Sequence, residues 1–360
     1  MRKAIAVLAV LLVATAVVAV VSAGAPSASA DTDFTAPTDD YVIISDQDTL
    51  TDFERWAKGT AADDSIVISG KLNGTVGDYA ISSFFRTGGD QTAVYVMIDG
   101  NLAVSQSILF GAPHENFRII VFGGAEGSGL TAATAGVASL ITVGDSNATA
   151  VEFHNLAVSN AGHSGSTIAV NGNTEFTMTG CTVTGWANAT NSAVYCGSGS
   201  TVEISTTVIT GNAGTGFNGA AVYCGVNAAV TVKNSSVLNN SCANSRADGG
   251  SSGAVYCASG AVVKLDTVKF TGNSAVKDYG RGAAVFISSA ESVDITNCTF
   301  TDNTSTGSGG AIATNNAALG TGSSRIAVAV TGCIFTGNTA AGNTKWVGSG
   351  GAISIGDNYC

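Results

Sequence analysis

The chain has 360 residues, of which 46 are Gly, 3 are Pro, 45% are hydrophobic and 11% are charged. This composition is too apolar for a disordered chain and too poor in Leu, Lys and Glu for a helical bundle, so it indicates a β-rich protein. The 15 basic and 26 acidic residues give a net charge of -11, which opposes binding to nucleic acid or to anionic membranes. We therefore expect no nucleic-acid partner.

The first thirty residues have the order of a secretory signal peptide. Arg2 and Lys3 precede an apolar run over residues 4–23, and Ala28-Ser29-Ala30 follows as a small-residue cleavage pattern. Residues 1–30 are thus predicted to be a signal peptide, and the mature chain to be extracellular or at the cell surface, with no membrane-spanning segment. The alternative is an uncleaved membrane anchor, because the apolar run is just long enough to span a bilayer.

Residues 31–140 are interpreted as a capping helix followed by irregular opening coils. Over Thr49–Lys58, the residues Leu50, Phe53 and Trp56 share one stripe, and Asp52 follows Thr49 at the spacing of a capping box. A helix laid over the first coil would cover strand edges that otherwise invite aggregation. Strands are predicted after it at residues 65–69, 93–98, 107–110, 117–122 and 139–143.

Two short motifs recur at a fixed distance through residues 141–360. One is an apolar anchor, as in Val194-Tyr195-Cys196, and the other ends at an asparagine, as in Phe270-Thr271-Gly272-Asn273. The next asparagine is 18 residues after the anchor in four copies, Val194 to Asn212, Val222 to Asn240, Val255 to Asn273 and Val285 to Asn303, whereas the gap to the following anchor varies from 9 to 15 residues. A constant body with a variable joint is typical of one turn of a solenoid, with its loops along one side.

Within each repeat the residues alternate as they do in a strand, with valine pointing inward and tyrosine outward. Ile295 and Phe300 are an odd number of residues apart, so a bend must separate them if both are buried. Asn297 is well placed to make this bend, because asparagine tolerates left-handed backbone geometry. We predict one all-β domain, a right-handed parallel β-helix with a short N-terminal capping helix and coils about 4.8 Å apart.

The motif pair resembles the repeats of the polymorphic outer-membrane protein family. The resemblance rests on Gly-Gly-Ala-Ile at residues 309–312 and 350–353, and on the motifs that end at Asn273, Asn303 and Asn338. More loosely, the coils are similar to the pectin-lyase-like β-helix of surface adhesins and polysaccharide-active enzymes. The resemblance covers residues 140–355 and implies an adhesion scaffold that is displayed on a surface or secreted. Nothing after Ile353 resembles the membrane barrel that anchors members of that family.

The eight cysteines are expected to form mainly a thiol core. Side chains on parallel, in-register strands point the same way, which fits disulfide geometry poorly, so we expect at most one or two bridges. Two residues outside the repeated positions, Cys242 and Cys360, are expected to be exposed thiols. The inward cysteines form two sets, Cys196 with Cys224 and Cys257, and Cys181 with Cys298 and Cys333.

The candidate binding residues are Tyr195, Tyr223, Tyr256 and Phe286, which are expected to stack outward in one row. An exposed aromatic strip can bind sugar rings or peptide, so the expected partner is an extended glycan or a surface or matrix protein. Stacked aromatic side chains can also serve only to stabilise the surface of a solenoid.

The sequence gives little support for catalysis. Gly162-His163 is similar to the Gly-His turn of polygalacturonases, but the Asn-Thr-Asp and paired Asp elements of those enzymes are missing from the neighbouring coils. Glycoside hydrolysis needs two carboxyl groups facing one cleft, whereas the acidic residues here do not repeat at one coil position. No catalytic residue, metal ligand or cofactor is predicted. We expect an adhesin-like or structural binding scaffold, with a polysaccharide lyase or glycoside hydrolase of the same fold as the alternative.

Overall fold

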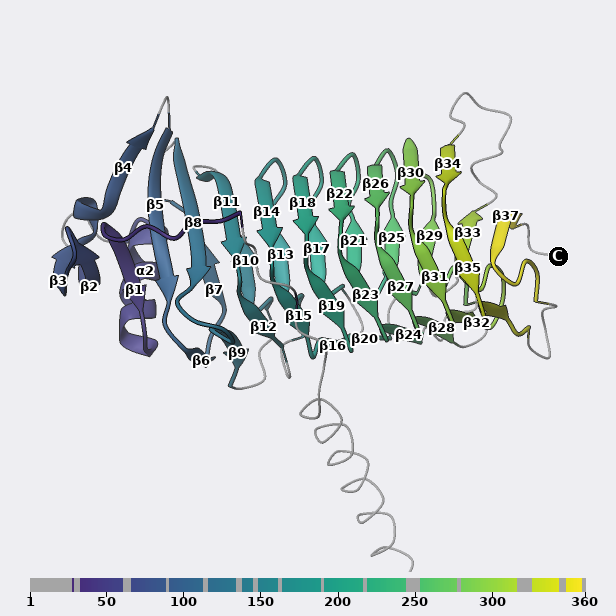
Figure 1. Cartoon of the computed structure of the whole chain (residues 1–360), viewed down its shortest axis with the longest axis horizontal. Coiled ribbons are helices and arrows are strands. Elements are labelled where there is room, and N and C mark those ends of the chain that lie inside the picture. Colours follow the sequence, from purple (N-terminus) through teal and green to yellow (C-terminus); the bar gives the residue numbers. More distant parts are fainter. Residues whose placement is uncertain are drawn as a thin grey trace, which may run out of the picture.

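The computed structural model describes residues 28, 33–60, 66–88, 91–112, 116–133, 138–144, 148–160, 164–188, 191–215, 219–243, 253–276, 280–315, 326–342 and 348–357. These residues form a parallel β-helix whose coils stack along one axis, from the helix α2 (Gln47–Ala57) at one end to β37 (Ile353–Asp357) at the other (Figure 1). The predicted fold class is confirmed. The signal sequence predicted at residues 1–30 lies outside the described residues, except for Ala28.

Each regular coil contributes one strand to each of four sheets, which we call A, B, C and D. Sheet A contains β1 (Tyr41–Ile44), β2 (Val67–Leu72), β3 (Thr75–Ala80), β4 (Phe85–Gly88), β5 (Gln91–Ile98), β8 (Phe117–Gly123), β11 (Ala148–His154), β14 (Glu175–Thr179), β18 (Thr201–Ser205), β22 (Ala229–Lys233), β26 (Val262–Asp266), β30 (Ser292–Thr296) and β34 (Ala327–Thr331). Sheet B contains β6 (Asn101–Val104), β9 (Gly129–Ala132), β12 (Ala157–Ser159), β15 (Thr182–Thr184), β19 (Val208–Thr210), β23 (Ser236–Leu238), β27 (Lys269–Thr271), β31 (Thr299–Thr301) and β35 (Ile334–Thr336).

Sheet C contains β7 (Ile108–Phe110), β10 (Ile141–Val143), β13 (Ile168–Val170), β17 (Val194–Cys196), β21 (Val222–Cys224), β25 (Val255–Cys257), β29 (Val285–Ile287), β33 (Ile312–Asn315) and β37. Sheet D contains β16 (Ala187–Asn188), β20 (Ala213–Gly214), β24 (Ser241–Ala243), β28 (Ser274–Val276), β32 (Thr304–Ser305) and β36 (Thr339–Ala340). The variable joints separate sheet D from sheet C in every regular coil, so their ends line one edge of sheet C, as the repeat spacing predicts.

The anchors of the repeat form one buried column in sheet C. Each anchor pairs in register with the anchor of the next coil, and the exposed fraction of these side chains is at most 1%. The column predicted from the 18-residue offset is therefore confirmed, and it consists of Val194, Val222, Val255, Val285 and Ile312.

The bend between sheets A and B is made by one residue in the left-handed region. Asn297 directly follows β30 and has φ of 55°, as predicted. The equivalent residues of other coils include Asn155, Asn234 and Thr267, with φ of 54°, 50° and 57°. Such a residue reverses the alternation of side chains, so that apolar residues on both sides of the bend point inward.

The asparagines of the second motif form a ladder through the interior. The Oδ1 of each asparagine accepts hydrogen bonds from the backbone N–H and the Nδ2 of the preceding one, and its own Nδ2 donates to a backbone carbonyl of the coil before. The ladder distances between Nδ2 and Oδ1 are 2.9 Å from Asn212 to Asn240, 3.1 Å to Asn273, 2.9 Å to Asn303 and 2.8 Å to Asn338. The fixed asparagine of the repeat thus satisfies buried polar groups at every coil junction.

Helix α2 covers the first coil, but it begins earlier than the sequence predicts. Its N-cap is Asp46, whose side chain accepts from the backbone N–H of Thr49 while the Thr49 hydroxyl faces the backbone N–H of Asp46. The capping box therefore runs from Asp46 to Thr49, not from Thr49 to Asp52. Phe53 and Trp56 are fully buried, and Glu54 Oε1 accepts from the backbone N–H of Leu109, 3.2 Å away on the first strand of sheet C.

The opening coils contain the predicted strands with shifts of up to three residues at their ends. Three antiparallel pairings were not expected, β1 with β2, β2 with β3 and β4 with β5, and neither was the short 3-10 helix η1 (Ile81–Phe84). The β2–β3 turn is Asn73-Gly74, with φ of 51° and 82°, a sequence that favours tight hairpins. Among the described residues, no helix has the length and the apolar composition needed to cross a bilayer.

Candidate functional site

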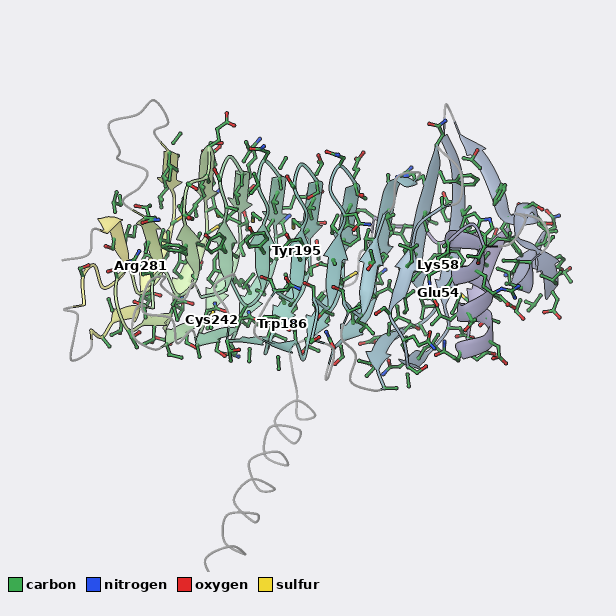
Figure 2. The ribbon with its side chains drawn as sticks, turned by 180° about the vertical axis from the view of Figure 1, so that it is seen from behind. Glu54, Lys58, Trp186, Tyr195, Cys242 and Arg281 are labelled. Carbon is green, nitrogen blue, oxygen red and sulfur yellow. The ribbon has the colours of Figure 1, made fainter. Side chains whose placement is uncertain are left out.

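The predicted aromatic row lies on the outer face of sheet C, near the middle of the solenoid, where Figure 2 labels Tyr195. Each aromatic residue is the central residue of its strand, between two buried residues, so alternation turns it outward. Tyr195 pairs in register with Tyr223, Tyr223 with Tyr256, and Tyr256 with Phe286. The three tyrosines are half-buried, as a surface row should be.

The tyrosine rings are stacked face to face along the solenoid axis. Ring centroids are 4.9 Å apart between Tyr195 and Tyr223, with an angle of 7° between the planes, and 5.4 Å apart between Tyr223 and Tyr256, with an angle of 20°. Nearly parallel rings this close cannot lie side by side in one plane without overlap, so their faces are against each other. The parts of Tyr223 that can meet a partner are therefore its edge and its hydroxyl group.

Phe286 does not belong to the exposed row. Its exposed fraction is 5%, and its ring is tilted by 50° against that of Tyr256 at a centroid distance of 5.7 Å. The sequence-based assignment of Phe286 as an exposed binding residue is wrong, because strand alternation fixes the side on which a residue lies but not what covers it. We call the remaining set, Tyr195, Tyr223 and Tyr256, the tyrosine row.

Packing within the row also changes the acidity of the Tyr223 hydroxyl group. Burial, with a smaller effect of the neighbouring Tyr195 and Tyr256, raises the pKa of the Tyr223 hydroxyl to about 12. At neutral pH this hydroxyl is therefore protonated and can both donate and accept a hydrogen bond. The row offers a partner neutral hydroxyl groups at a regular interval.

The cysteines of the coils are thiols in the part of the chain that the structure describes. Cys196, Cys224 and Cys257 are buried in one inward column, and burial raises the pKa of Cys196 to about 12. A hydrogen bond with Cys257, together with burial, raises the pKa of Cys224 well above its usual value. Protonated, buried thiols are poor nucleophiles, so these residues contribute to packing.

The expectation that Cys242 is exposed is wrong. Cys242 is 1% exposed because the residues after each asparagine form sheet D, whose central residues alternate inward. Cys360 lies outside the described residues. Of the second inward set, Cys181 and Cys298 are buried, whereas Cys333 is half-buried.

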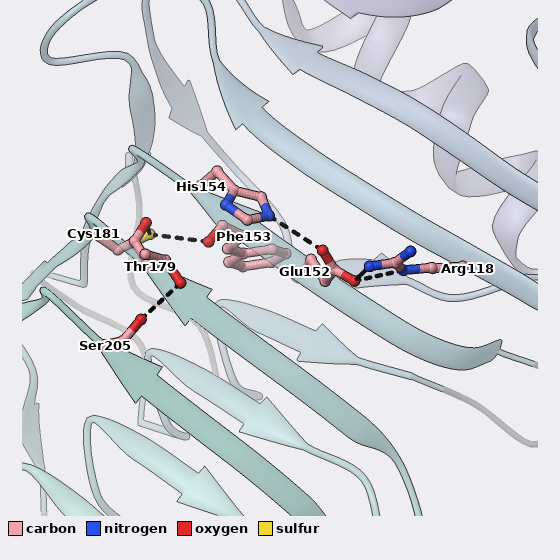
Figure 3. A network of polar contacts seen from close by, with 7 residues as sticks. All are labelled: Arg118, Glu152, Phe153, His154, Thr179, Cys181 and Ser205. Carbon is pink, nitrogen blue, oxygen red and sulfur yellow. Dashed lines mark hydrogen bonds and ion pairs between the residues drawn. The ribbon is translucent and has the colours of Figure 1, made fainter. Parts of the chain in front are cut away.

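A polar cluster on the outer face of sheet A was not anticipated (Figure 3). Arg118 on β8 donates to Glu152 Oε1 on β11, and His154 Nε2 lies 3.2 Å from Glu152 Oε2. The ring of Phe34 stacks on His154, with centroids 4.1 Å apart and an angle of 11° between the planes. Glu152 and His154 share β11, but Arg118 and Phe34 come from other parts of the chain, so no sequence spacing connects these two residues to them.

The charge of this cluster is balanced internally. Burial raises the pKa of the Glu152 carboxyl, but the hydrogen bonds from His154 and Arg118 and the Arg118 charge outweigh it, so the pKa is lowered overall. Glu152 is thus an ionised carboxylate held between two partners. Such a group has the properties of an ion-pair anchor, whereas a general acid needs a raised pKa.

A groove of about 520 Å³ lies at the corner between sheets A and B. It is lined mainly by small residues, and the backbone N–H of Ala28 donates to the hydroxyl of Thr182 at 3.2 Å along its wall. Among the described residues that line it, the one carboxyl group is that of Glu126. A single carboxylate among glycine and alanine residues does not provide the acid and base pair of a glycosidase.

Among the described residues, no group of three His, Cys, Asp or Glu side chains is arranged to hold a metal ion. His163, the residue similar to the polygalacturonase turn, lies outside the described residues. Comparison with known protein families, curated proteins and solved structures gave no significant match.

Proposed function

We propose that this protein is an exported, adhesin-like binding scaffold, secreted or held at the cell surface, that binds an extended glycan along the outer face of sheet C. The observation that carries the proposal is the tyrosine row, which presents three in-register side chains at intervals of 4.9 and 5.4 Å. Export is supported by the charged, apolar and small-residue order of residues 1–30.

The repetition of the row favours a partner that is itself repetitive. Successive coils place the same hydroxyl group at the same position, so a chain of identical units lying along the axis can make the same contact more than once. Tyrosine is suited to this role because it offers a large rigid ring and a polar tip at a small cost in conformational entropy. The net charge of -11 favours a neutral glycan over an acidic one.

The enzymatic alternative is less well supported by the described residues. The cluster at Glu152 and the groove at Glu126 each contain one carboxylate, and that of Glu152 is already paired with Arg118 and His154. A polysaccharide hydrolase uses two carboxyl groups on opposite sides of the scissile bond. Binding without a chemical step is therefore the function that we propose.

The test is the double substitution Tyr223→Ser with Tyr256→Ser, measured on an array of immobilised neutral and acidic oligosaccharides. We expect the solenoid to remain folded and binding to fall by roughly five- to a hundred-fold, which is the range of about 1–3 kcal/mol for aromatic contact residues. The matched control is Tyr95→Ser, which removes a half-buried tyrosine from the outer face of sheet A. Equal binding by the parent and the double variant, or no binding by the parent, would contradict the proposal.

A further inference from the structure

The tyrosine row ends abruptly at Tyr195. The next positions on the same line of sheet C are Ala169 on β13, Thr142 on β10 and Leu109 on β7, each paired in register with its neighbour. All three side chains are half-exposed, so this strip of the face is accessible. Along this line the side chain changes from the ring of Tyr195 to the methyl group of Ala169 within one coil spacing of about 4.8 Å.

The two faces of Tyr195 are consequently in different environments. One face lies on the ring of Tyr223 at 4.9 Å, as described above. The other face points along the axis toward the position of Ala169, whose methyl group is too short to cover an aromatic ring. In contrast, Tyr223 has a tyrosine ring on each side. The row therefore has one aromatic face that no ring among the described residues covers, and that face belongs to Tyr195.

The residues around this face form a shelf of ring size, bounded by the Tyr195 ring and by the side chain of Leu109. Its floor consists of the Ala169 methyl group and the Thr142 side chain, two coils wide and thus about 10 Å. We call these residues, Leu109, Thr142, Ala169 and Tyr195, the shelf.

We infer that the shelf binds one pyranose ring of a neutral glycan, stacked on the uncovered face of Tyr195 above Ala169. The inference rests on the function proposed above and specifies where the sugar ring sits. The partly positive C–H groups on one face of a pyranose are attracted to the negative face of an aromatic ring. The hydroxyl groups of Thr142 and Tyr195 are the polar side-chain groups of the shelf with which sugar hydroxyls can form hydrogen bonds.

Ala169 is then the residue that determines specificity, because its small size leaves the aromatic face open. A larger aromatic residue at this position would extend the row by one ring and occupy the space of the sugar. The inner tyrosines present only hydroxyl groups and edges, and no stacking face.

The experiment compares the parent with Ala169→Tyr in titrations with cellohexaose, chitohexaose and mannohexaose. For whichever hexaose the parent binds, we expect Ala169→Tyr to weaken binding by about tenfold or more while the circular dichroism spectrum is unchanged. The matched control is Thr177→Tyr, which adds the same ring at a half-buried position on the outer face of sheet A and should bind like the parent. Ala169→Val, which adds less bulk, provides a second variant if Ala169→Tyr does not fold, and it should weaken binding to a smaller extent.

The outcomes separate the two proposals. If Ala169→Tyr binds the hexaose as well as the parent, whereas the double tyrosine variant does not, the glycan lies along the hydroxyl groups and the shelf inference is wrong. If no hexaose or arrayed glycan binds the parent, the proposed function fails and the inference fails with it. A third outcome concerns peptide. If the parent binds an aromatic dipeptide that no glycan displaces, and Ala169→Tyr abolishes that binding, the shelf binds peptide and its assignment to a sugar is wrong.

Discussion

At the level of single residues, the sequence predicts polar turn residues well and burial on outer faces poorly. The bend at Asn297 follows from an odd spacing between two core residues and from the tolerance of asparagine for positive φ, and both facts are local. The burial of Phe286 depends instead on what covers the outer face of sheet C, about which strand alternation contains no information. Cys242 was assigned to the wrong environment because the sequence did not predict the strand of sheet D in which it points inward.

The cluster around Glu152 shows the same limit. Arg118, Glu152 and Phe34 are brought together only when the coils stack and the N-terminal segment crosses them, so their association depends on the complete fold. Their chemistry, however, permits a prediction with a defined pH dependence.

We expect Glu152→Gln to reduce the free energy of unfolding by about 1.5–3 kcal/mol at pH 7, because it removes the charge from two charge-assisted hydrogen bonds. The pKa of Glu152 is lowered in the folded state, so the carboxylate stabilises the fold above its usual value of 4.5 and this contribution is lost as the pH falls below it. Urea denaturation of the parent and of Glu152→Gln, at pH 7 and at low pH, measures the difference in their free energies of unfolding. A difference in stability that stays constant across that range would contradict the ion-pair role.

At the level of elements, the strands and the capping helix could be predicted because their signals are periodic. The 18-residue offset fixes the register of the coils, and the spacing of Leu50, Phe53 and Trp56 identifies the helix. The N-cap of the helix was misplaced by three residues because Asp46 and Thr49 are both good N-caps, and only the folded structure shows which is used. The hairpins at the first coil were missed, because alternation within a strand does not show which strand pairs with it.

The contribution of the asparagine ladder to the stability of the fold can be measured directly. Asn273 accepts from the backbone and side chain of Asn240 and donates to Asn303 and to the Val237 carbonyl. Asn273→Ala would leave buried groups on both neighbouring coils without partners. We expect it to lower the free energy of unfolding by about 2–4 kcal/mol, measured by urea denaturation.

Asn239→Gly is the matched control, because Asn239 is exposed and has φ of 53°, a geometry that glycine adopts readily. It should change the free energy of unfolding by less than about 0.5 kcal/mol. Similar losses for the two variants would show that the ladder stabilises the fold no more than an ordinary turn does.

At the level of the whole molecule, the described coils differ in how completely their apolar side chains are covered. Helix α2 buries the first coil, and Glu54 satisfies a backbone N–H at its edge. In the last described coils, large apolar side chains remain exposed, including Val330 at 38%, Ile334 at 61% and Ile355 at 72%. Because each coil contacts only its neighbours, stability should vary along the axis.

Hydrogen exchange followed by mass spectrometry measures how local stability varies along the solenoid axis. We expect the amide hydrogens of β34, β35 and β37 to exchange faster than those of β18, β19 and β21, which are paired with complete coils on both sides. Uniform exchange from one end to the other would mean that the solenoid opens as a single cooperative unit.

The asparagine ladder also has a mechanical consequence. Successive ladder residues are 28, 33, 30 and 35 residues apart, so detaching one coil releases about 90–125 Å of extended chain. A force pulling on the end away from α2 loads one junction at a time, since each coil is bonded only to its neighbours. We expect a tethered molecule to unfold in steps of about this length, absorbing work at each junction while the coils nearer α2 remain folded.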